Sequence, residues 1–245
     1  MKFVKRSLRK IFNDAGYEIV NIKVAQAENE KRRWAWLRSA NFGTVLDIGA
    51  NVGQFAGLIQ KYLPDASLYS FEPIPECYNA LVLKMKSHTN FKSFNLALGD
   101  LDGETDFFVS EFSPSSSLLP MGKLHQELFP ETASSVVRPV KIARLDSLAN
   151  QIVVNGNLLI KMDAQGAEDN IIRGGIEFFK RANAVLTEIS YESMYVGQPL
   201  FRDIHSMLDE LGFRFSGTMF QQIRPSDQLP IYGDALFVNT CFSEL

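Results

Sequence analysis

The amino-acid sequence predicts an α/β protein with a doubly wound, mostly parallel sheet that ends in an antiparallel strand pair. Three observations support this prediction. Short apolar runs alternate with helical patterns from residue 44 onward, which is typical of parallel sheets with helical crossovers. A glycine-containing turn follows the first strand, at Gly49 and Gly53. Two apolar runs near the end of the chain, 213–215 and 235–238, are joined by a polar stretch that suits a hairpin.

The size and composition indicate an ordinary globular chain. The 245 residues are 46% hydrophobic and 22% charged, with a net charge of -3, and such a chain can bury a full α/β core. The acidic balance gives no electrostatic footprint for nucleic acid, so no nucleic-acid partner is expected. We expect a helical N-terminal extension over residues 1–40 and one domain over 41–245. Nothing in the composition indicates an oligomeric state.

The N-terminal segment is basic and amphipathic. Apolar residues such as Phe3, Val4 and Leu8 alternate with lysine and arginine, so the segment suits either a helix packed on its own domain or one lying on an anionic membrane. No continuous apolar stretch suggests a secretory signal or a span, so stable membrane insertion is not expected. The two cysteines, Cys77 and Cys241, have no metal-site spacing, and a reduced cytoplasmic location fits.

The first half of the predicted sheet has three strands separated by two helices. The first helix stops before Pro64, and Pro73 and Pro75 rigidify the turn before the second helix. Gly99 and Asp100 mark a turn after the third strand. The predicted strands cover about 44–48, 67–72 and 91–96, and the first helix covers about 53–62.

The alternation is interrupted over about 102–145. Two strand-like runs, 105–109 and 137–142, flank a long segment rich in serine and proline. We expect this connection to have no regular structure. Such long connections in compact domains usually form lids or binding loops, so we predict that the insert faces the substrate.

The α/β alternation then resumes and continues to the C-terminus. An apolar run over 158–163 ends in Asp163 and is followed by a helix that ends near Gly174. The next strand covers about 184–189. A helix over about 200–211 stops at Gly212, a residue suited to the left-handed cap position.

The turn after the first strand indicates which kind of nucleotide the sheet binds. A dinucleotide fingerprint needs a glycine where the backbone approaches a pyrophosphate, but Asn51 stands between Gly49 and Gly53. Asp47 adds a negative charge at the strand end, and Glu72 closes the second strand, where a carboxylate can accept ribose hydroxyls. This set favours S-adenosylmethionine, which carries ammonium and sulfonium charges and no phosphate. The glycines alone are also explained by the turn.

Several pieces of the sequence, taken in order, resemble one family. They are Leu46-Asp-Ile-Gly-Ala-Asn-Val-Gly53, Phe71-Glu-Pro73, Asn95-Leu-Ala-Leu-Gly-Asp100, Ser115-Ser-Ser-Leu118, Leu145-Asp-Ser-Leu148, Ile160-Lys-Met-Asp-Ala-Gln-Gly-Ala-Glu168 and Asp234-Ala-Leu-Phe-Val238. Over about residues 44–238 the chain resembles the FkbM-type S-adenosylmethionine-dependent methyltransferases. The resemblance implies a Rossmann-like class I methyltransferase fold and O-methylation of a hydroxyl on a sugar, glycan or other small molecule. It does not cover the N-terminal extension.

Further cofactor contacts are predicted within these pieces. Asn95, at the end of the third strand, has an amide that can read the adenine edge, although a turn-forming asparagine is an equal alternative. We also assign Ala97 and Ser116 to the cofactor site, with loop filler as the alternative for the serine. Asp163 completes the predicted set, as a cofactor contact or as a capping residue.

Methyl transfer to an alcohol calls for a group that accepts the hydroxyl proton. Asp163 is the leading candidate, and Glu188 on the adjacent strand can converge with it, to share a proton or to bind Mg²⁺. Glu168 suits either the site or the start of a helix. His125, in the insert, is the third candidate, because it lies where we expect the acceptor.

Three other functions fit parts of the sequence. A nicotinamide-dependent oxidoreductase shares the fold but is disfavoured by Asn51 and by the terminal strand pair. A non-catalytic binding protein can use the same fold, although Asp47, Glu72 and Asp163 argue against a decayed site. A nucleic-acid methyltransferase is disfavoured by the acidic balance and by the lack of an aromatic and basic stripe.

Overall fold

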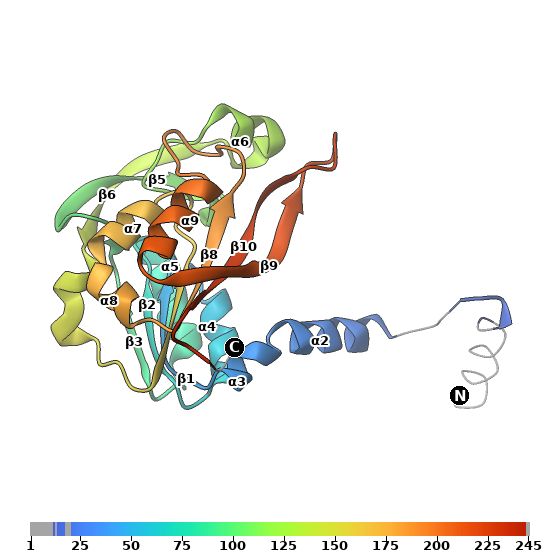
Figure 1. The fold of residues 1–245 in the computed structure, drawn as a ribbon. Coiled ribbons are helices and arrows are strands. Elements are labelled where there is room, and N and C mark those ends of the chain that lie inside the picture. The colour runs from blue at the N-terminus through green and yellow to red at the C-terminus, as the bar shows by residue number, and fades with distance from the viewer. Residues whose placement is uncertain (1–11, 13, 18–20, 244–245) are drawn as a thin grey trace. The chain divides into compact units, whose positions relative to one another are not determined.

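The computed structural model describes residues 12, 14–17 and 21–243, and its contacts divide the chain into two units, 1–36 and 37–245 (Figure 1). In the first unit, α2 (Ile22–Arg33) starts at Asn21, whose side chain accepts hydrogen bonds from the backbone N–H groups of Lys23 and Val24. The short helix α3 (Ala35–Ser39) follows. Most of the predicted basic amphipathic segment, residues 2–11, lies outside the described residues.

The second unit contains a seven-stranded sheet with the order β3-β2-β1-β7-β8-β10-β9. The five strands from β3 to β8 are parallel, whereas β10 is antiparallel to both β8 and β9. The strands are β1 (Phe42–Ile48), β2 (Ser67–Phe71), β3 (Phe91–Phe94), β7 (Asn157–Met162), β8 (Ala184–Ser190), β9 (Phe213–Ile223) and β10 (Pro230–Asn239). The predicted doubly wound sheet with a C-terminal antiparallel pair is confirmed.

Helices cover both faces of this sheet (Figure 1). On one side α4 (Gln54–Tyr62) packs against α5 (Pro75–Met85). On the other, α7 (Glu168–Gly174) contacts α8 (Ile176–Arg181) and α9 (Phe201–Glu210). The largest core cluster joins apolar side chains of that helix group to alternate positions of the central strands, as in Leu46, Ile48 and Ile160.

The insert has more regular structure than the sequence predicts. It forms a small sheet of β4 (Ala97–Leu98), β5 (Gly103–Ser110) and β6 (Ser135–Ala143), in the order β4-β6-β5. Between the longer strands lie η1 (Ser113–Ser115), α6 (Lys123–Leu128) and η2 (Pro130–Thr132), and η3 (Leu145–Gln151) follows the small sheet. The strands expected over 105–109 and 137–142 are confirmed as β5 and β6, whereas the expectation that the connection between them has no regular structure is wrong.

Tertiary packing explains this difference. Leu124 and Leu128 of α6 pack on a cluster that contains Met194, Tyr195 and Ile231, far away in the sequence. Two backbone hydrogen bonds, from Gly122 to Met194 and from Val196 to Pro120, hold the segments together. The periodicity of a short serine- and proline-rich segment cannot reveal partners 70 residues away.

The insert lies at the end of the sheet toward which the parallel strands point, as β8 and α6 show in Figure 1. This is the edge where ligands bind in open α/β sheets. No helix in the part of the chain that the structure describes combines the length and apolar character needed to cross a bilayer.

Candidate active site

The turns after β1 and β7 are in direct contact. The backbone N–H of Asp163 donates to the carbonyl of Ile48 at 3.1 Å. Gly49 has a left-handed φ of 73°, and a Cβ at this position would lie 1.9 Å from the carbonyl oxygen of Asp163. Only glycine fits such an approach without moving a backbone, so Gly49 serves loop-to-loop packing as well as the turn.

Glu72 anchors the turn that contains Asn51. Its two carboxylate oxygens accept hydrogen bonds from the backbone N–H groups of Asn51 and Ile74, each at 2.8 Å. Asn51 has a left-handed φ of 48°, and its side-chain amide donates to the hydroxyl of Ser113 in η1 of the insert. Burial raises the pKa of Glu72 to about 7, although the two N–H groups favour the ionised form.

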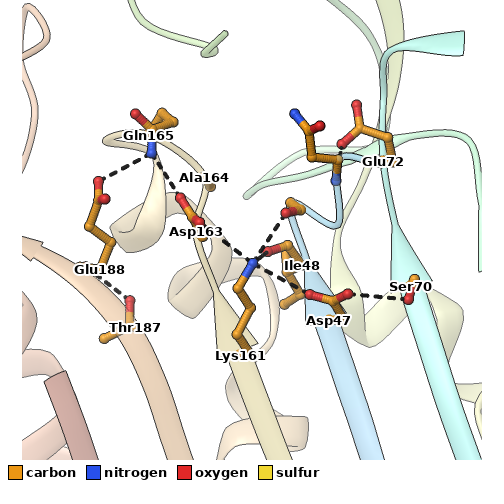
Figure 2. Close-up of polar contacts among 12 residues, drawn as sticks. Asp47, Ile48, Ser70, Glu72, Lys161, Asp163, Ala164, Gln165, Thr187 and Glu188 are labelled. Atoms are coloured by element: carbon orange, nitrogen blue, oxygen red, sulfur yellow. Dashed lines mark hydrogen bonds and ion pairs between the residues drawn. The ribbon is translucent and has the colours of Figure 1, made fainter. Parts of the chain in front are cut away.

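Asp47 and Lys161 form a buried ion pair beneath the turn (Figure 2). Their register pairs them across β1 and β7, and Lys161 Nζ lies 3.4 Å from Asp47 Oδ1. The same ammonium group donates to the carbonyl of Gly49 at 3.2 Å and lies 3.7 Å from Asp163 Oδ2. Asp47 has no exposed surface, so it supports the turn from below. Its contact with a cofactor stays a prediction.

The pKa values of this pair reflect burial and mutual attraction. Burial raises the pKa of Asp47, opposed by the charge of Lys161 and by the hydroxyl of Ser70. For Lys161, burial favours the neutral amine, but the charges of Asp47 and Asp163 outweigh it and raise the pKa. The lysine therefore stays protonated and ties the two loops together.

Asp163 and Glu188 come together through one side chain. The amide nitrogen of Gln165 donates to Asp163 Oδ1 at 2.8 Å and to Glu188 Oε1 at 3.3 Å, as Figure 2 shows. Burial raises the pKa of Glu188 well above its usual range, and the charges of Asp163, Glu168 and Asp234 add to the effect. The Asp163 side chain is 41% exposed, which makes it the accessible carboxylate of the two.

Glu168 shapes the same loop from inside. Its carboxylate accepts from the backbone N–H groups of Ala164 and Gly166 at 2.9 and 3.0 Å. The side chain is buried, and burial raises its pKa to about 7. The sequence predicts Glu168 either in the site or at the start of a helix. Its contacts favour the second position, where it supports the loop that leads into α7.

The insert is attached to this loop. The hydroxyl of Ser117 donates to the backbone carbonyl of Gln165 at 2.7 Å. Tyr195 contacts both parts, since its hydroxyl lies 2.8 Å from Gln165 Oε1 and 3.1 Å from the carbonyl of Ser115. The insert therefore contributes directly to the geometry around the two carboxylates.

His125 lies inside the insert. Its ring packs edge-on against Phe129 and Tyr195, and Nε2 lies 2.9 Å from the hydroxyl of Thr132. Nδ1 has no hydrogen-bond partner among the described residues, and burial lowers the pKa of the ring. The structure places it one aromatic ring away from Gln165, so its role as a base stays a prediction.

The remaining predicted cofactor contacts are engaged within the protein. Asn95 follows β3, and its amide donates to the backbone carbonyls of Glu72 and Pro73. Ala97 is buried in an apolar cluster beside Ile142. Ser116 accepts from the backbone N–H of Ser110, so its hydroxyl is engaged within the insert.

The carboxylates do not fit the predicted magnesium site. The amide hydrogens of Gln165 fill the position between Asp163 and Glu188 where a shared cation would need oxygen ligands. Among the described residues, no group of three or more histidine, cysteine, aspartate or glutamate side chains is arranged for a metal. The structure thus gives Mg²⁺ no support.

Sequence reasoning missed Gln165 and Ser113 as members of the site. Gln165 has a left-handed φ of 54°, a conformation that the amino-acid sequence alone does not reveal. A usable signal is that Gln165 precedes Gly166 in the loop after a strand that ends in Asp163. Ser113 lies in the insert, whose course depends on tertiary contacts.

Comparison with known proteins agrees with this architecture. The sequence pattern described as "Methyltransferase FkbM domain" matches residues 47–215, which is more than half of the chain. The 2-O-methyltransferase NoeI of Sinorhizobium fredii (strain NBRC 101917 / NGR234) is 30% identical over 171 residues, covering 67% of this chain and 70% of that protein.

Two further similarities are more distant. Methyltransferase sdnD of Sordaria araneosa is 26% identical over 200 residues, covering 68% of this chain and 66% of its own length. The solved structure of magnesium protoporphyrin IX methyltransferase (ChlM) from Synechocystis PCC 6803 covers 96% of this chain and 97% of that chain, with 12% identity and a TM-score of 0.46. The family match over residues 47–215 is decisive: the chain belongs to the FkbM methyltransferase family and is an S-adenosylmethionine-dependent methyltransferase.

Proposed function

We propose that this enzyme transfers the methyl group of S-adenosylmethionine to a hydroxyl oxygen of a saccharide or other small molecule. The observation that carries the proposal is the pair formed by Asp163 and Glu188, held by one amide at the carboxyl ends of adjacent parallel strands. An alcohol is a poor nucleophile, and a carboxylate that accepts its proton in the transition state makes it competent.

The turn after β1 and Glu72 suit the cofactor. S-adenosylmethionine, when bound, supplies the electrophilic methyl carbon. Each carboxylate oxygen of Glu72 accepts one backbone N–H group and so keeps acceptor capacity for a ribose hydroxyl. Asn51 keeps a side chain where a pyrophosphate would need bare backbone, which favours a nucleoside without phosphates.

Asp163 is the proposed proton acceptor. It is the more accessible carboxylate, and Lys161 and Gln165 fix its two oxygens from opposite directions. A base needs this fixed orientation toward the hydroxyl as much as it needs a suitable pKa. Burial and the neighbouring carboxylates raise the pKa of Glu188 and so disfavour a second full charge beside Asp163.

A saccharide hydroxyl is the proposed acceptor because of the relative named as a 2-O-methyltransferase. We propose no particular sugar. The test uses isotopically labelled S-adenosylmethionine with a panel of saccharides that carry a free 2-hydroxyl and with the matching 2-deoxy sugars. Label is expected in the first group alone, and NMR of the product should place the methyl group on oxygen.

The catalytic assignment is tested in the same assay with Asp163→Asn. Losing the base is expected to lower kcat by about 100-fold, while binding of S-adenosylmethionine in calorimetry changes little. Asp100→Asn, which alters an exposed carboxylate paired with Arg173, is the control. Methylation of nitrogen or carbon in place of oxygen, or full activity of Asp163→Asn, would contradict the proposal.

A further inference from the structure

Gln165 has a hydrogen-bonding pattern that leaves one orientation for its amide. Both partners of the nitrogen, Asp163 and Glu188, are carboxylates that accept. The partner of the oxygen is the hydroxyl of Tyr195, which can donate. Reversing the amide would set its oxygen against two carboxylate oxygens, so the chemistry itself fixes which atom faces which group.

The backbone of this residue is also constrained. Gln165 has a φ of 54° and Gly166 a φ of 98°, so two consecutive residues adopt left-handed conformations. For a residue other than glycine this conformation costs about 1 kcal/mol or more. Ser117 donates to the carbonyl of Gln165, and Glu168 accepts from the N–H of Gly166. These contacts compensate the cost and aim the side chain between the carboxylates.

We propose that Gln165 is a positioning residue that fixes the Asp163 and Glu188 carboxylates relative to each other and links them, through Tyr195, to the docked insert. The catalytic consequence rests on the proposed function, whereas the positioning itself does not. Because the amide donates to both carboxylates, it also favours their ionised forms.

The charges around Glu188 come from several elements. Asp163 follows β7, Glu168 starts α7 and Asp234 lies opposite Glu188 on β10; all three disfavour its ionisation. Lys161 acts in the opposite direction. Tyr195 and Tyr232 also interact electrostatically with this group, and burial together with the carboxylates raises the pKa of Tyr232 to about 12. Gln165 is the neutral donor within this acidic set.

The test measures the titration of Glu188 by NMR of protein labelled with ¹³C at its carboxyl groups, with Glu188→Gln used for assignment. Gln165→Met keeps the length of the side chain and removes both donated hydrogen bonds. The pH midpoint of the Glu188 titration is expected to rise by about one pH unit. Gln60→Met, which alters a glutamine that bonds to Ser87 on the surface, should leave the midpoint unchanged.

A second variant covers the case in which Gln165→Met does not fold. Gln165→Asn keeps the amide but is one methylene shorter, so a smaller rise in the same direction is expected. Tyr195→Phe should also raise the midpoint, and should add nothing in the Gln165→Met background, because the tyrosine acts through the glutamine. An unchanged midpoint in both Gln165 variants, or additive effects with Tyr195→Phe, would overturn the proposal.

Turnover separates this inference from the proposed function. Gln165→Met is expected to lower kcat at least tenfold and to change KM for S-adenosylmethionine less than twofold, because the residue acts on the base. If the wild-type enzyme methylates no hydroxyl but the midpoint moves, the positioning role stands and the proposed function fails. If it methylates and the midpoint does not move, the reverse holds.

Discussion

Glu72 shows how one carboxylate can organise a cofactor turn. It is almost fully buried, yet it bonds two backbone N–H groups from different sides of the site, those of Asn51 and Ile74. A glutamine here would present amide hydrogens to one of those donors and leave it unsatisfied. We therefore expect Glu72→Gln to weaken binding of S-adenosylmethionine by about 10-fold to 100-fold.

Calorimetry with S-adenosylmethionine checks this expectation. Glu76→Gln is the matched control, since Glu76 is an exposed glutamate nearby that pairs with Arg138. Equal affinities for the Glu72 variant and the wild type would show that the carboxylate does not serve the cofactor.

The residue scale also shows what the sequence could and could not predict. Asp47, Gly49, Asn51 and Glu72 are predictable together because they lie at or just after strand ends, where spacing along the chain determines position. The structure places Asp47 in β1 beneath the turn, and the other three in the turns after β1 and β2. Gln165 could not be found in this way, because its role depends on a left-handed backbone and on contacts from the insert.

At the scale of elements, one ion pair joins β1 to β7. Lys161 lies between Asp47 and Asp163, and Asp47 is fully buried. Removing the ammonium group leaves a buried carboxylate without its counter-charge, which typically costs about 3 to 5 kcal/mol. Lys161→Met should therefore lower the free energy of unfolding by this amount in urea denaturation.

The double variant Asp47→Asn with Lys161→Met provides the control, because it removes both charges. It should recover most of the lost stability. If the double variant is as unstable as Lys161→Met, packing of the lysine stem matters more than its charge.

The contact between the turns after β1 and β7 gives a second prediction at this scale. A Cβ at Gly49 meets the Asp163 carbonyl at 1.9 Å, in addition to the strain of φ 73°. Gly197 has a similar φ of 80° with open space around it. Gly197→Ala is expected to cost about 1 kcal/mol of stability, and Gly49→Ala clearly more, because a backbone must move.

Thermal unfolding of the two alanine variants separates the cost of a left-handed φ, which both share, from the cost of the Cβ collision, which only Gly49→Ala has. Similar losses of stability in both would mean that the turns can move apart without cost. In that case the close approach would not matter for the site.

The elements themselves were mostly predictable. The alternation of apolar runs and helical patterns predicts the parallel strands within a few residues, whereas the runs 213–215 and 235–238 mark only parts of the longer β9 and β10. Gly212 has the left-handed φ of 88° that its cap position predicts. The third strand ends early at Phe94, because the side chain of Asn95 turns to the carbonyls of Glu72 and Pro73. In the insert, β5 and β6 are visible as strand-like runs in the sequence, whereas α6 depends on distant partners.

For the whole molecule, buried glutamates should make stability depend on pH. The pKa of Glu168 is about 7 in the folded chain against an ordinary 4.5. Between these values the folded chain holds a proton that the unfolded chain has released, so stability falls as pH rises from 4.5 to 7 and is constant above. Such a shift is worth about 3 kcal/mol.

The measurement compares wild type with Glu168→Gln in urea denaturation from pH 5 to 8. Wild type should lose stability relative to the variant as the pH rises. His125, whose lowered pKa acts in the opposite direction, is present in both proteins and cancels. A difference that is independent of pH would contradict the raised pKa.

The way the insert is attached has a consequence for how such an enzyme can diversify. Ser117 and the backbone around Gly122 fix the insert to Gln165 and Met194, whereas α6 and η2 lie between these anchors and β6. New sequences can therefore be exchanged between Lys123 and Ser134 if apolar side chains are kept at Leu124 and Leu128, which pack on Met194, Tyr195 and Ile231. Because we predict that the insert faces the acceptor, we expect grafts of this segment from relatives to change acceptor preference on an unchanged methyl-transfer scaffold.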